Sequence, residues 1–82
     1  MSAAPSLWRM DIRRQLGLNV RRIRAEKGWS QEDLAFESGL HRTYISGIER
    51  GIRNPTIVIL AKLAETLEVE PGELLERVRR NS

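Results

Sequence analysis

Residues 31–48 read QEDLAFESGLHRTYISGI, and this stretch decides the fold. Two short helices that cross at a steep angle need a small residue where they touch, a turn residue that accepts a positive φ angle, and apolar anchors on both sides. Ala35 supplies the contact and Gly39 the turn. The anchors are Leu34, Leu40, Ile45 and Ile48. The spacing predicts a helix-turn-helix, and an ordinary helical hairpin of a bundle is the alternative.

The signals at the start of this motif are unusually complete. Ser30 is placed to cap the helix that ends near Ser38, and Asp33 lies where the second partner of a capping box lies. Trp29 precedes the cap and is placed to pack on Leu34. These signals predict that a helix begins directly after Ser30, and that the next helix runs from Arg42 to about Arg50.

A longer helix is predicted before the motif, from about Asp11 to Lys27. Its apolar residues recur at intervals of three or four, which places them in a stripe along one side. The stripe consists of Ile12, Leu16, Val20 and Ile23. Gly28 is expected to end this helix, because glycine tolerates the left-handed conformation.

Two more helices are predicted after the motif. Thr56 is placed to cap the first, and Glu70 precedes the second, with Pro71 at its first position, where the missing N–H costs nothing. The side chains of the first of these helices that are expected to face inward are Ile57, Leu60, Ala61, Ala64 and Leu67. The apolar residues of the second are Leu74, Leu75 and Val78. No stretch has the alternation typical of strands. We therefore expect an all-α, compact five-helix domain over residues 11–79, with a flexible tail at 1–10 and a frayed end at 80–82.

The composition excludes several classes of protein. The chain has no cysteine, so disulfides, thiolate metal sites and cysteine nucleophiles are absent, and its single histidine has no partner for metal or acid–base chemistry. No apolar run approaches the ~20 residues of a membrane span. We expect a cytoplasmic protein with no metal, cofactor, membrane or small-molecule ligand, and not an enzyme, since no glycine loop is built to cradle phosphates.

Positive charge is concentrated in the first two-thirds of the chain. Residues 1–59 hold ten Lys/Arg and six Asp/Glu, whereas residues 60–82 hold four and five. A surface that binds phosphates requires this kind of distribution. A solvated basic surface is the alternative.

The pattern SQEDLA…SGL…YIS.IERG.RNPT….LAK.AETLEV, within roughly residues 12–76, resembles the Cro/C1-type (XRE, lambda-repressor-like) helix-turn-helix family. Residues 42–55, RTYISGIERGIRNP, are most similar to the controller proteins of restriction–modification systems. Small XRE regulators outside such systems share much of this stretch. The resemblance implies a five-helix lambda-repressor-like domain that acts as a homodimeric transcription factor on inverted repeats.

The start of the helix from Arg42 to about Arg50 is the predicted base-reading surface, because such helices present their N-terminal residues to base edges. Arg42 is the first candidate, since a guanidinium pairs bidentately with guanine. The positive end of the helix dipole also disfavours an arginine at this position that has only solvent as a partner. Thr43, Tyr44 and Ser46 are the other candidates. For these three, polar surface or packing against the turn is the alternative.

Four residues are predicted to contact DNA phosphates, which position a domain without reading sequence. Gln31 resembles the family glutamine at a helix start, where side chain and helix N-terminus together grip a phosphate. Arg50, Arg53 and Asn54 lie in and before the loop that leads to residue 56. The alternative for Gln31 is an ordinary residue of a first helical turn, and the alternative for the other three is a flexible basic loop.

Two residues of the same helix are predicted to serve the fold. The resemblance aligns Glu49 with an acid that pairs with an arginine of the first helix, here Arg24, so we expect an interhelical ion pair. Gly47 is unfavourable by ~1 kcal/mol relative to alanine inside a helix. This indicates a close approach to the backbone there, by either a neighbouring helix or DNA.

The C-terminal part carries more apolar residues than a small monomer needs. The residues off the expected stripe, which we assign to a dimer interface, are Ile59, Leu63, Val69, Leu75 and Val78. Surplus apolar surface rimmed by charge suggests an interface, with a slightly larger core as the alternative. A twofold dimer would place two recognition helices ~34 Å apart and require a palindromic operator.

The sequence therefore predicts a nucleoid-associated bacterial regulator that binds double-stranded DNA as a homodimer and controls restriction–modification genes. RNA polymerase is a candidate further partner. The alternatives are an XRE repressor unrelated to restriction–modification and a protein-interaction module, such as an antitoxin that binds a toxin with its C-terminal helices.

Overall fold

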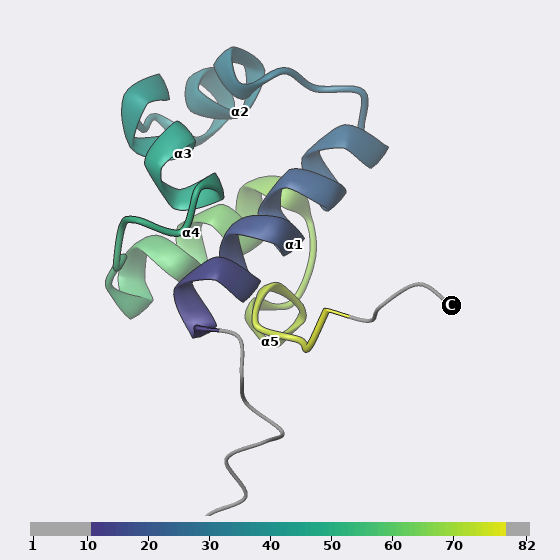
Figure 1. Cartoon of the computed structure of the whole chain (residues 1–82). Helices are drawn as coiled ribbons and strands as arrows, with labels where there is room; N and C mark the ends of the chain where they lie inside the picture. The colour runs from purple at the N-terminus through teal and green to yellow at the C-terminus, as the bar shows by residue number, and fades with distance from the viewer. Residues whose placement is uncertain (1–10, 79–82) are drawn as a thin grey trace, which may run out of the picture.

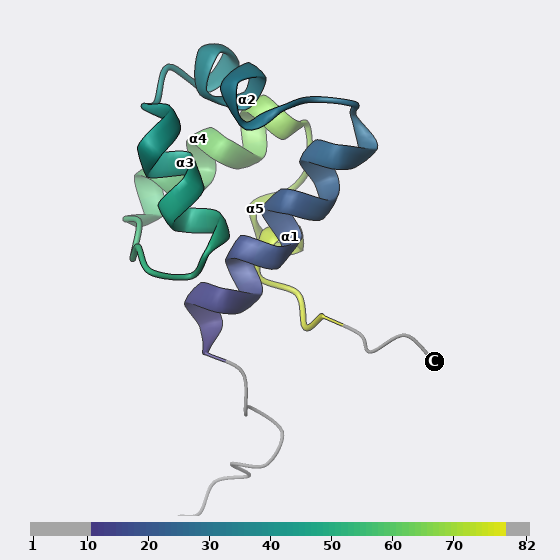
Figure 2. The same cartoon turned by 45° about the horizontal axis from the view of Figure 1, so that its top comes forward.

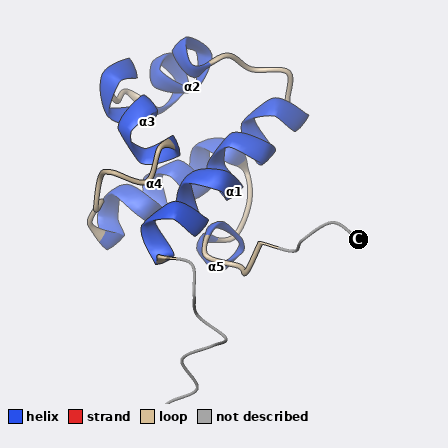
Figure 3. Ribbon diagram, in the orientation of Figure 1, coloured by secondary structure: helices blue, strands red, loops and turns tan. Residues whose placement is uncertain are grey.

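The computed structural model describes residues 11–78, and all regular structure in that range is helical (Figure 1, Figure 3). The helices are α1 (Ile12–Glu26), α2 (Gln31–Ser38), α3 (Arg42–Glu49), α4 (Ile57–Leu67) and α5 (Pro71–Leu74). The predicted all-α, five-helix fold is confirmed. The predicted tail at 1–10 and the end from 79 onward lie outside the described residues.

The helix-turn-helix begins and turns as the sequence predicts. Ser30 Oγ accepts from the backbone N–H of Asp33 at 3.0 Å, and the Asp33 carboxylate accepts from the Ser30 N–H at 2.8 Å, which closes the capping box. Gly39 ends α2 with a φ angle of 75°, a conformation that costs glycine little. Two views show α2 and α3 side by side, with α1 crossing below them (Figure 1, Figure 2).

The core lies between α1, the helix-turn-helix pair and α4, and α5 closes one end. Leu34, Ile45 and Ile48 are buried, as predicted for anchors of the motif. Along α1 the predicted stripe is buried except at its start, because Ile12 is exposed in the first turn. The remaining buried apolar residues are Leu16, Val20, Ile23, Ala35, Leu63, Ala64, Leu67 and Leu74.

The predicted inward face of α4 is wrong in part. Ile57 and Ala61 are exposed, whereas Leu63 is fully buried in the core. The α4 sequence starts IVILAKLA, so apolar residues lie on nearly every side, and helical periodicity alone could not choose between two stripes. A side chain buried within one chain cannot meet a second copy. The assignment of Leu63 to a dimer interface is therefore wrong.

The helix α5 ends at Leu74, earlier than predicted, because the predicted helix included Val78. Two buried amides of α1 hold the chain that follows. Asn19 Nδ2 donates to the carbonyl oxygens of Leu74 at 3.0 Å and Glu76 at 2.8 Å, and Gln15 Oε1 accepts from the Val78 N–H at 3.3 Å. These bonds take the place of further helical turns and fasten the C-terminal segment to α1.

Gly17 sets how closely α1 and α3 pack. A Cβ atom at this position would lie 2.6 Å from the carbonyl oxygen of Glu49 and closer still to that of Ile48. Only glycine leaves room for this approach, and the approach brings the end of α3 against α1. Of the helices within residues 11–78, none has the length and apolar character that crossing a membrane requires.

Candidate nucleic-acid interface

The helix α3 has one face in the core and one face open. Ile45 and Ile48 are buried, whereas Arg42 and Thr43 are exposed at its first turn, and Ser46 is half-buried. His41 occupies the N-cap position without a side-chain hydrogen bond to the helix. The first turn of α3 therefore presents polar side chains and free backbone N–H groups outward, as a surface that meets an anionic partner would.

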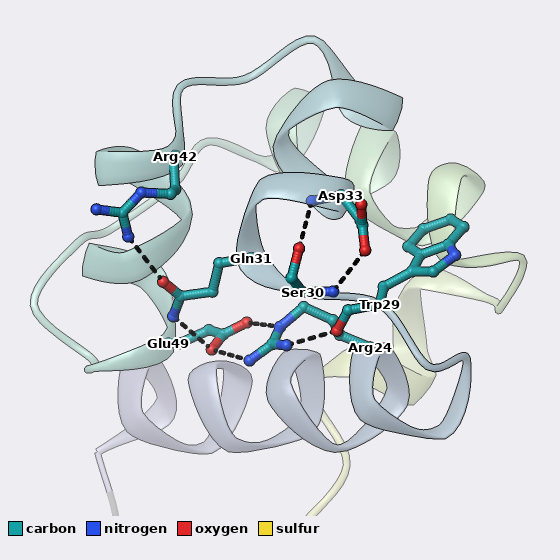
Figure 4. Close-up of polar contacts among 7 residues, drawn as sticks. All are labelled: Arg24, Trp29, Ser30, Gln31, Asp33, Arg42 and Glu49. Carbon is teal, nitrogen blue, oxygen red and sulfur yellow. Dashed lines mark hydrogen bonds and ion pairs between the residues drawn. The ribbon is translucent and has the colours of Figure 1, made fainter.

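Arg42 is held by α2 in this structure. Its Nη1 donates to Gln31 Oε1 at 3.3 Å (Figure 4), and its Nε lies 4.0 Å from Glu32 Oε2. The Arg42 side chain is still 51% exposed, so most of its donors face solvent. Glu32 had no role in the sequence prediction, and no local pattern could reveal it, because the pairing depends on where α2 and α3 meet.

The expected pair between Arg24 and Glu49 is present. Arg24 Nε donates to Glu49 Oε2 at 2.6 Å and its Nη2 donates to Oε1 at 2.9 Å, a bidentate contact that raises the pKa of Arg24 above its usual range. The third guanidinium nitrogen, Nη1, donates to the carbonyl oxygen of Trp29 at 2.7 Å (Figure 4). Arg24 thus ties α1 to the end of α3 and to the segment that enters α2.

Gln31, predicted to grip a phosphate, makes internal bonds in this structure. Its Nε2 donates to Glu49 Oε1 at 3.0 Å, while its Oε1 accepts from Arg42. The residue is half-buried at the first position of α2, beside the backbone N–H groups of that helix N-terminus. The position is compatible with a phosphate contact, and the internal bonds were not anticipated.

The loop after α3 folds back over that helix through Arg53. The Arg53 guanidinium carbon lies 5.5 Å from the centroid of the Tyr44 ring, within the range of a cation–π contact. A Cβ atom on Gly47 would lie 2.7 Å from Arg53 Cγ. The close approach predicted at Gly47 is therefore made by a loop side chain, and neither a helix nor DNA is needed to explain it.

The other predicted phosphate contacts lie around the same loop. Arg50 is exposed at the C-cap of α3, and Arg53 and Asn54 are exposed before Pro55. The structure thus gathers Arg50 and Arg53 near the end of α3, while Gln31 and Arg42 lie at its start. Asn54 also lines an apolar surface groove between α1 and α4.

Exposed apolar side chains gather between α1, the start of α4 and the end of α5. We call this surface the apolar groove, and its lining is Ile12, Arg13, Leu16, Asn54, Pro55, Ile57, Leu60 and Leu75. Of the residues predicted at a dimer interface, Leu75 lines the groove, whereas Ile59, Val69 and Val78 are half-buried. Ile57, which is 81% exposed, and Val58, which is 72% exposed, were not among the residues predicted at that interface.

No group of His, Cys, Asp and Glu side chains within residues 11–78 is arranged to hold a metal ion. The polar side chains described above instead offer hydrogen-bond donors and positive charge. Such a surface can bind an anionic polymer and contact base edges.

Comparison with known proteins gives three consistent matches. A helix-turn-helix family model matches residues 20–74. The control protein C.BamHI of Bacillus amyloliquefaciens is 51% identical over 67 residues, which are 80% of this chain and 83% of that protein. The crystal structure of the restriction–modification controller protein C.AhdI of Aeromonas hydrophila is 50% identical, with a TM-score of 0.73, and the match covers 76% of this chain and 94% of that one.

A further match is a complex with DNA. The crystal structure of SinR, the master regulator for biofilm formation, in complex with DNA is 37% identical, with a TM-score of 0.71, over 74% of this chain and 98% of that one. The family match includes the whole of α2, α3 and α4, and therefore both helices of the candidate interface.

Proposed function

The chain belongs to the helix-turn-helix family, and from this premise we propose that it is a sequence-specific transcriptional regulator that binds double-stranded DNA as a homodimer. The observation that carries the proposal is the first turn of α3, where Arg42 and Thr43 are exposed while Ile45 fixes the helix to the core. Family membership agrees with the prediction that the chain is not an enzyme, because the relatives that it matches are regulators and controllers.

In this proposal α3 enters the major groove with its N-terminal turn facing the bases. Arg42 pairs with the O6 and N7 atoms of a guanine, and the exposed Thr43 and the half-buried Tyr44 and Ser46 are the further base contacts. Gln31 and the N-terminus of α2 approach a phosphate on one side, and Arg50 and Arg53 approach phosphates on the other. The arrangement is supported by the positions of these residues: Arg42 lies at the start of α3, and Arg50 and Arg53 lie at and after its end.

The apolar groove is proposed as the dimer interface, with a second copy of this chain as its occupant. Ile57 exposes most of its side chain at the start of α4, and Leu75 lines the same groove. A contiguous apolar patch on a small domain marks an interaction surface. A twofold axis there would repeat the reading helix ~34 Å away and match a palindromic operator.

The regulated genes are proposed to be those of a restriction–modification system. The relatives C.BamHI and C.AhdI are control proteins, and the identity to each is about half of the aligned residues. RNA polymerase is the proposed further partner, and the bacterial nucleoid is the proposed place of action. Mapping the bound sites in a genome tests this: sites beside an endonuclease or methyltransferase gene support the proposal, and their absence leaves an XRE repressor of other genes.

Selection of bound sequences from random DNA tests the DNA-binding proposal itself. We expect an inverted repeat whose half-sites are about one DNA turn apart. Binding should weaken steeply with salt, because each neutralised phosphate contributes about −0.9 to the logarithmic salt slope. Enrichment of no sequence, with equal affinity for all duplexes, would contradict the proposal.

Analytical ultracentrifugation tests the dimer. Ile57→Glu should shift the protein from dimer to monomer, because it places a charge in the groove. Phe36→Glu is the matched control, since Phe36 is 83% exposed on α2 and lies outside the groove. A wild-type protein that is monomeric at tens of micromolar would exclude this interface.

A further inference from the structure

Two amide side chains of α1, Gln15 and Asn19, hold residues 75–78, which we call the C-terminal segment. Leu75, the first residue of this segment, also lines the apolar groove. We propose that Gln15 and Asn19 are positioning residues of the dimer interface, because they place Leu75 in the groove before a second copy binds. This inference rests on the proposed homodimer, and it adds two residues that lie outside the lining of the groove.

The helix α5 cannot by itself fix the chain that follows it. It has four residues, and a helix this short is not stable without contacts to other elements. Leu74 is fully buried and holds α5 to the core, whereas Leu75, Glu76 and Arg77 are exposed. Burial of apolar side chains therefore does not explain the path of the chain after Leu74.

Hydrogen bonds from α1 explain that path. The carbonyl groups at the end of a helix have no partner within the helix and must find one elsewhere. Asn19 Nδ2 donates to the carbonyl oxygens of Leu74 and Glu76, at 3.0 and 2.8 Å. Gln15 Nε2 donates to the carbonyl oxygen of Leu75 at 3.4 Å. The two amide residues are 2% and 3% exposed, so water competes little for these bonds, and Figure 1 shows α5 and the chain after it beside α1.

The bonds require amide groups at both positions. Gln15 also accepts from the Val78 N–H at 3.3 Å, so it needs a donor and an acceptor on one side chain. Asn19 donates twice, and its Oδ1 accepts from Arg22 Nη2 at 3.4 Å. A carboxylate would set an oxygen against the same carbonyl groups, and an apolar side chain would leave them without a partner. The two amides therefore specify where the C-terminal segment lies.

The C-terminal segment supplies one wall of the apolar groove. Among the residues that line the groove, only Leu75 comes after α4 in the chain. The other apolar residues of the lining come from α1, from α4 and from the loop before α4, and they are Ile12, Leu16, Pro55, Ile57 and Leu60. A copy whose C-terminal segment has left α1 lacks this wall and offers a second copy a smaller apolar surface.

Both copies of a twofold dimer need this wall, because the same surface meets itself across the axis. An apparent dissociation constant rises as the reciprocal of the fraction of molecules that are competent to bind. Because two copies must be competent, the fraction enters here as its square. A substitution that leaves the segment in place in about one third to one half of the molecules would raise the dimer dissociation constant about fourfold to ninefold.

Sedimentation equilibrium measures the dimer dissociation constant. Gln15→Met keeps the length of the side chain and removes its two hydrogen bonds, and Asn19→Leu removes those of the other amide. We expect each variant to keep the helical circular dichroism of the wild type and to raise the dissociation constant at least about fourfold. Arg21→Met is the matched control, since Arg21 is exposed on the same helix, and it should leave the constant unchanged.

Leu75→Ala separates positioning from a general loss of stability. If the amides act by placing the Leu75 side chain, Gln15→Met and Asn19→Leu should not raise the dissociation constant further once Leu75 is replaced. An equal rise in both backgrounds would show that the amides act through the stability of the whole domain. That result would overturn the inference.

Hydrogen exchange tests the inference without changing either amide. In Ile57→Glu, the variant expected to be monomeric, the Val78 N–H should exchange more slowly than in an unfolded chain, because Gln15 accepts its hydrogen bond within one copy. Exchange at the rate of a free amide would show that the segment is held only after dimerisation. The amides would then not position Leu75 in advance.

The dissociation constants also distinguish failure of the inference from failure of the proposed homodimer. A wild-type dimer whose dissociation constant is the same in Gln15→Met and Asn19→Leu would refute the positioning role alone. A wild-type protein that is monomeric at tens of micromolar would refute the homodimer, and the positioning role with it.

Discussion

Arg24→Met tests the buried ion pair that joins α1 to α3. The substitution keeps an unbranched apolar side chain in place but removes three hydrogen bonds, two to Glu49 and one to the carbonyl oxygen of Trp29. The Glu49 carboxylate, 4% exposed, is then left with the amide of Gln31 as its remaining partner. We expect the domain to lose much of its stability.

The size of the stability loss follows from the burial of the Glu49 carboxylate, which keeps its charge in the variant. Removing one partner of a buried pair costs ~3–5 kcal/mol. The Arg24 side chain is 14% exposed, so water can reach the site, and we take the lower end, about 3 kcal/mol. For a domain of this size each kcal/mol lowers the melting temperature by roughly 4–8 °C. The expected fall is therefore roughly 12–24 °C.

Thermal unfolding followed by circular dichroism measures this effect. Arg22→Met is the matched control, because Arg22 pairs with Glu26 on the exposed side of α1. The control should lose no more than about 0.5 kcal/mol. Adding Glu49→Leu to Arg24→Met should restore at least half of the loss, because the buried charge is gone. A single variant that melts within a few degrees of the wild type would refute this reasoning.

Three other perturbations give distinct outcomes. Gly17→Ala should lower the free energy of unfolding by about 1–3 kcal/mol in a denaturant titration, because its Cβ meets backbone carbonyl oxygens. Gly47→Ala should leave the melting temperature within a few degrees, since better helix propensity offsets the lost stacking, but it should weaken DNA binding by displacing the exposed Arg53. Hydrogen bonds from Arg13 lower the pKa of Asp11 from 3.8 to about 2, so its contribution to stability is present above pH 3.8 and is lost as the pH falls through 2. NMR titration of Asp11 should place its midpoint near 2 in the wild type and closer to the ordinary value in Arg13→Met.

The helix-turn-helix was predictable because its determinants are local. A capping box spans four residues, and the turn depends on the φ angle of one glycine, Gly39. The anchors Ile45 and Ile48 are three residues apart on a short helix with a polar opposite face, so only one orientation buries them. Where a segment is amphipathic and clearly bounded, its sequence is enough to place it.

The C-terminal part was less predictable because its determinants are not local. The helix α4 is apolar on most sides, so only the position of α2 and α5 decides that Leu63 is buried and Ile57 is exposed. The end of α5 depends on Asn19 and Gln15, which lie 55 or more positions earlier in the chain. Polar residues on the buried side of α1 gave no signal of this role.

The candidate interface was predictable only in part. Arg42 and Thr43 were identifiable from their place at the start of a predicted helix, and both are exposed. The bond between Gln31 and Glu49 joins residues 18 positions apart and depends on how α2 meets α3. The contact between Arg53 and Tyr44 likewise requires the loop to fold back over Gly47. The family resemblance implied the pair of Arg24 and Glu49, but sequence patterns did not reveal these other contacts between side chains.

The most direct test of the DNA-reading role of α3 is a comparison of the sequences selected from random DNA by the wild type and by Arg42→Ala. Arg42 is exposed and makes no contact with the core, so the variant should melt as the wild type does. We predict that the wild type selects an inverted repeat, and that Arg42→Ala loses ~1–3 kcal/mol of base preference at one position in each half-site. The same preference at every position in a folded Arg42→Ala protein would contradict the claim that the start of α3 reads the operator.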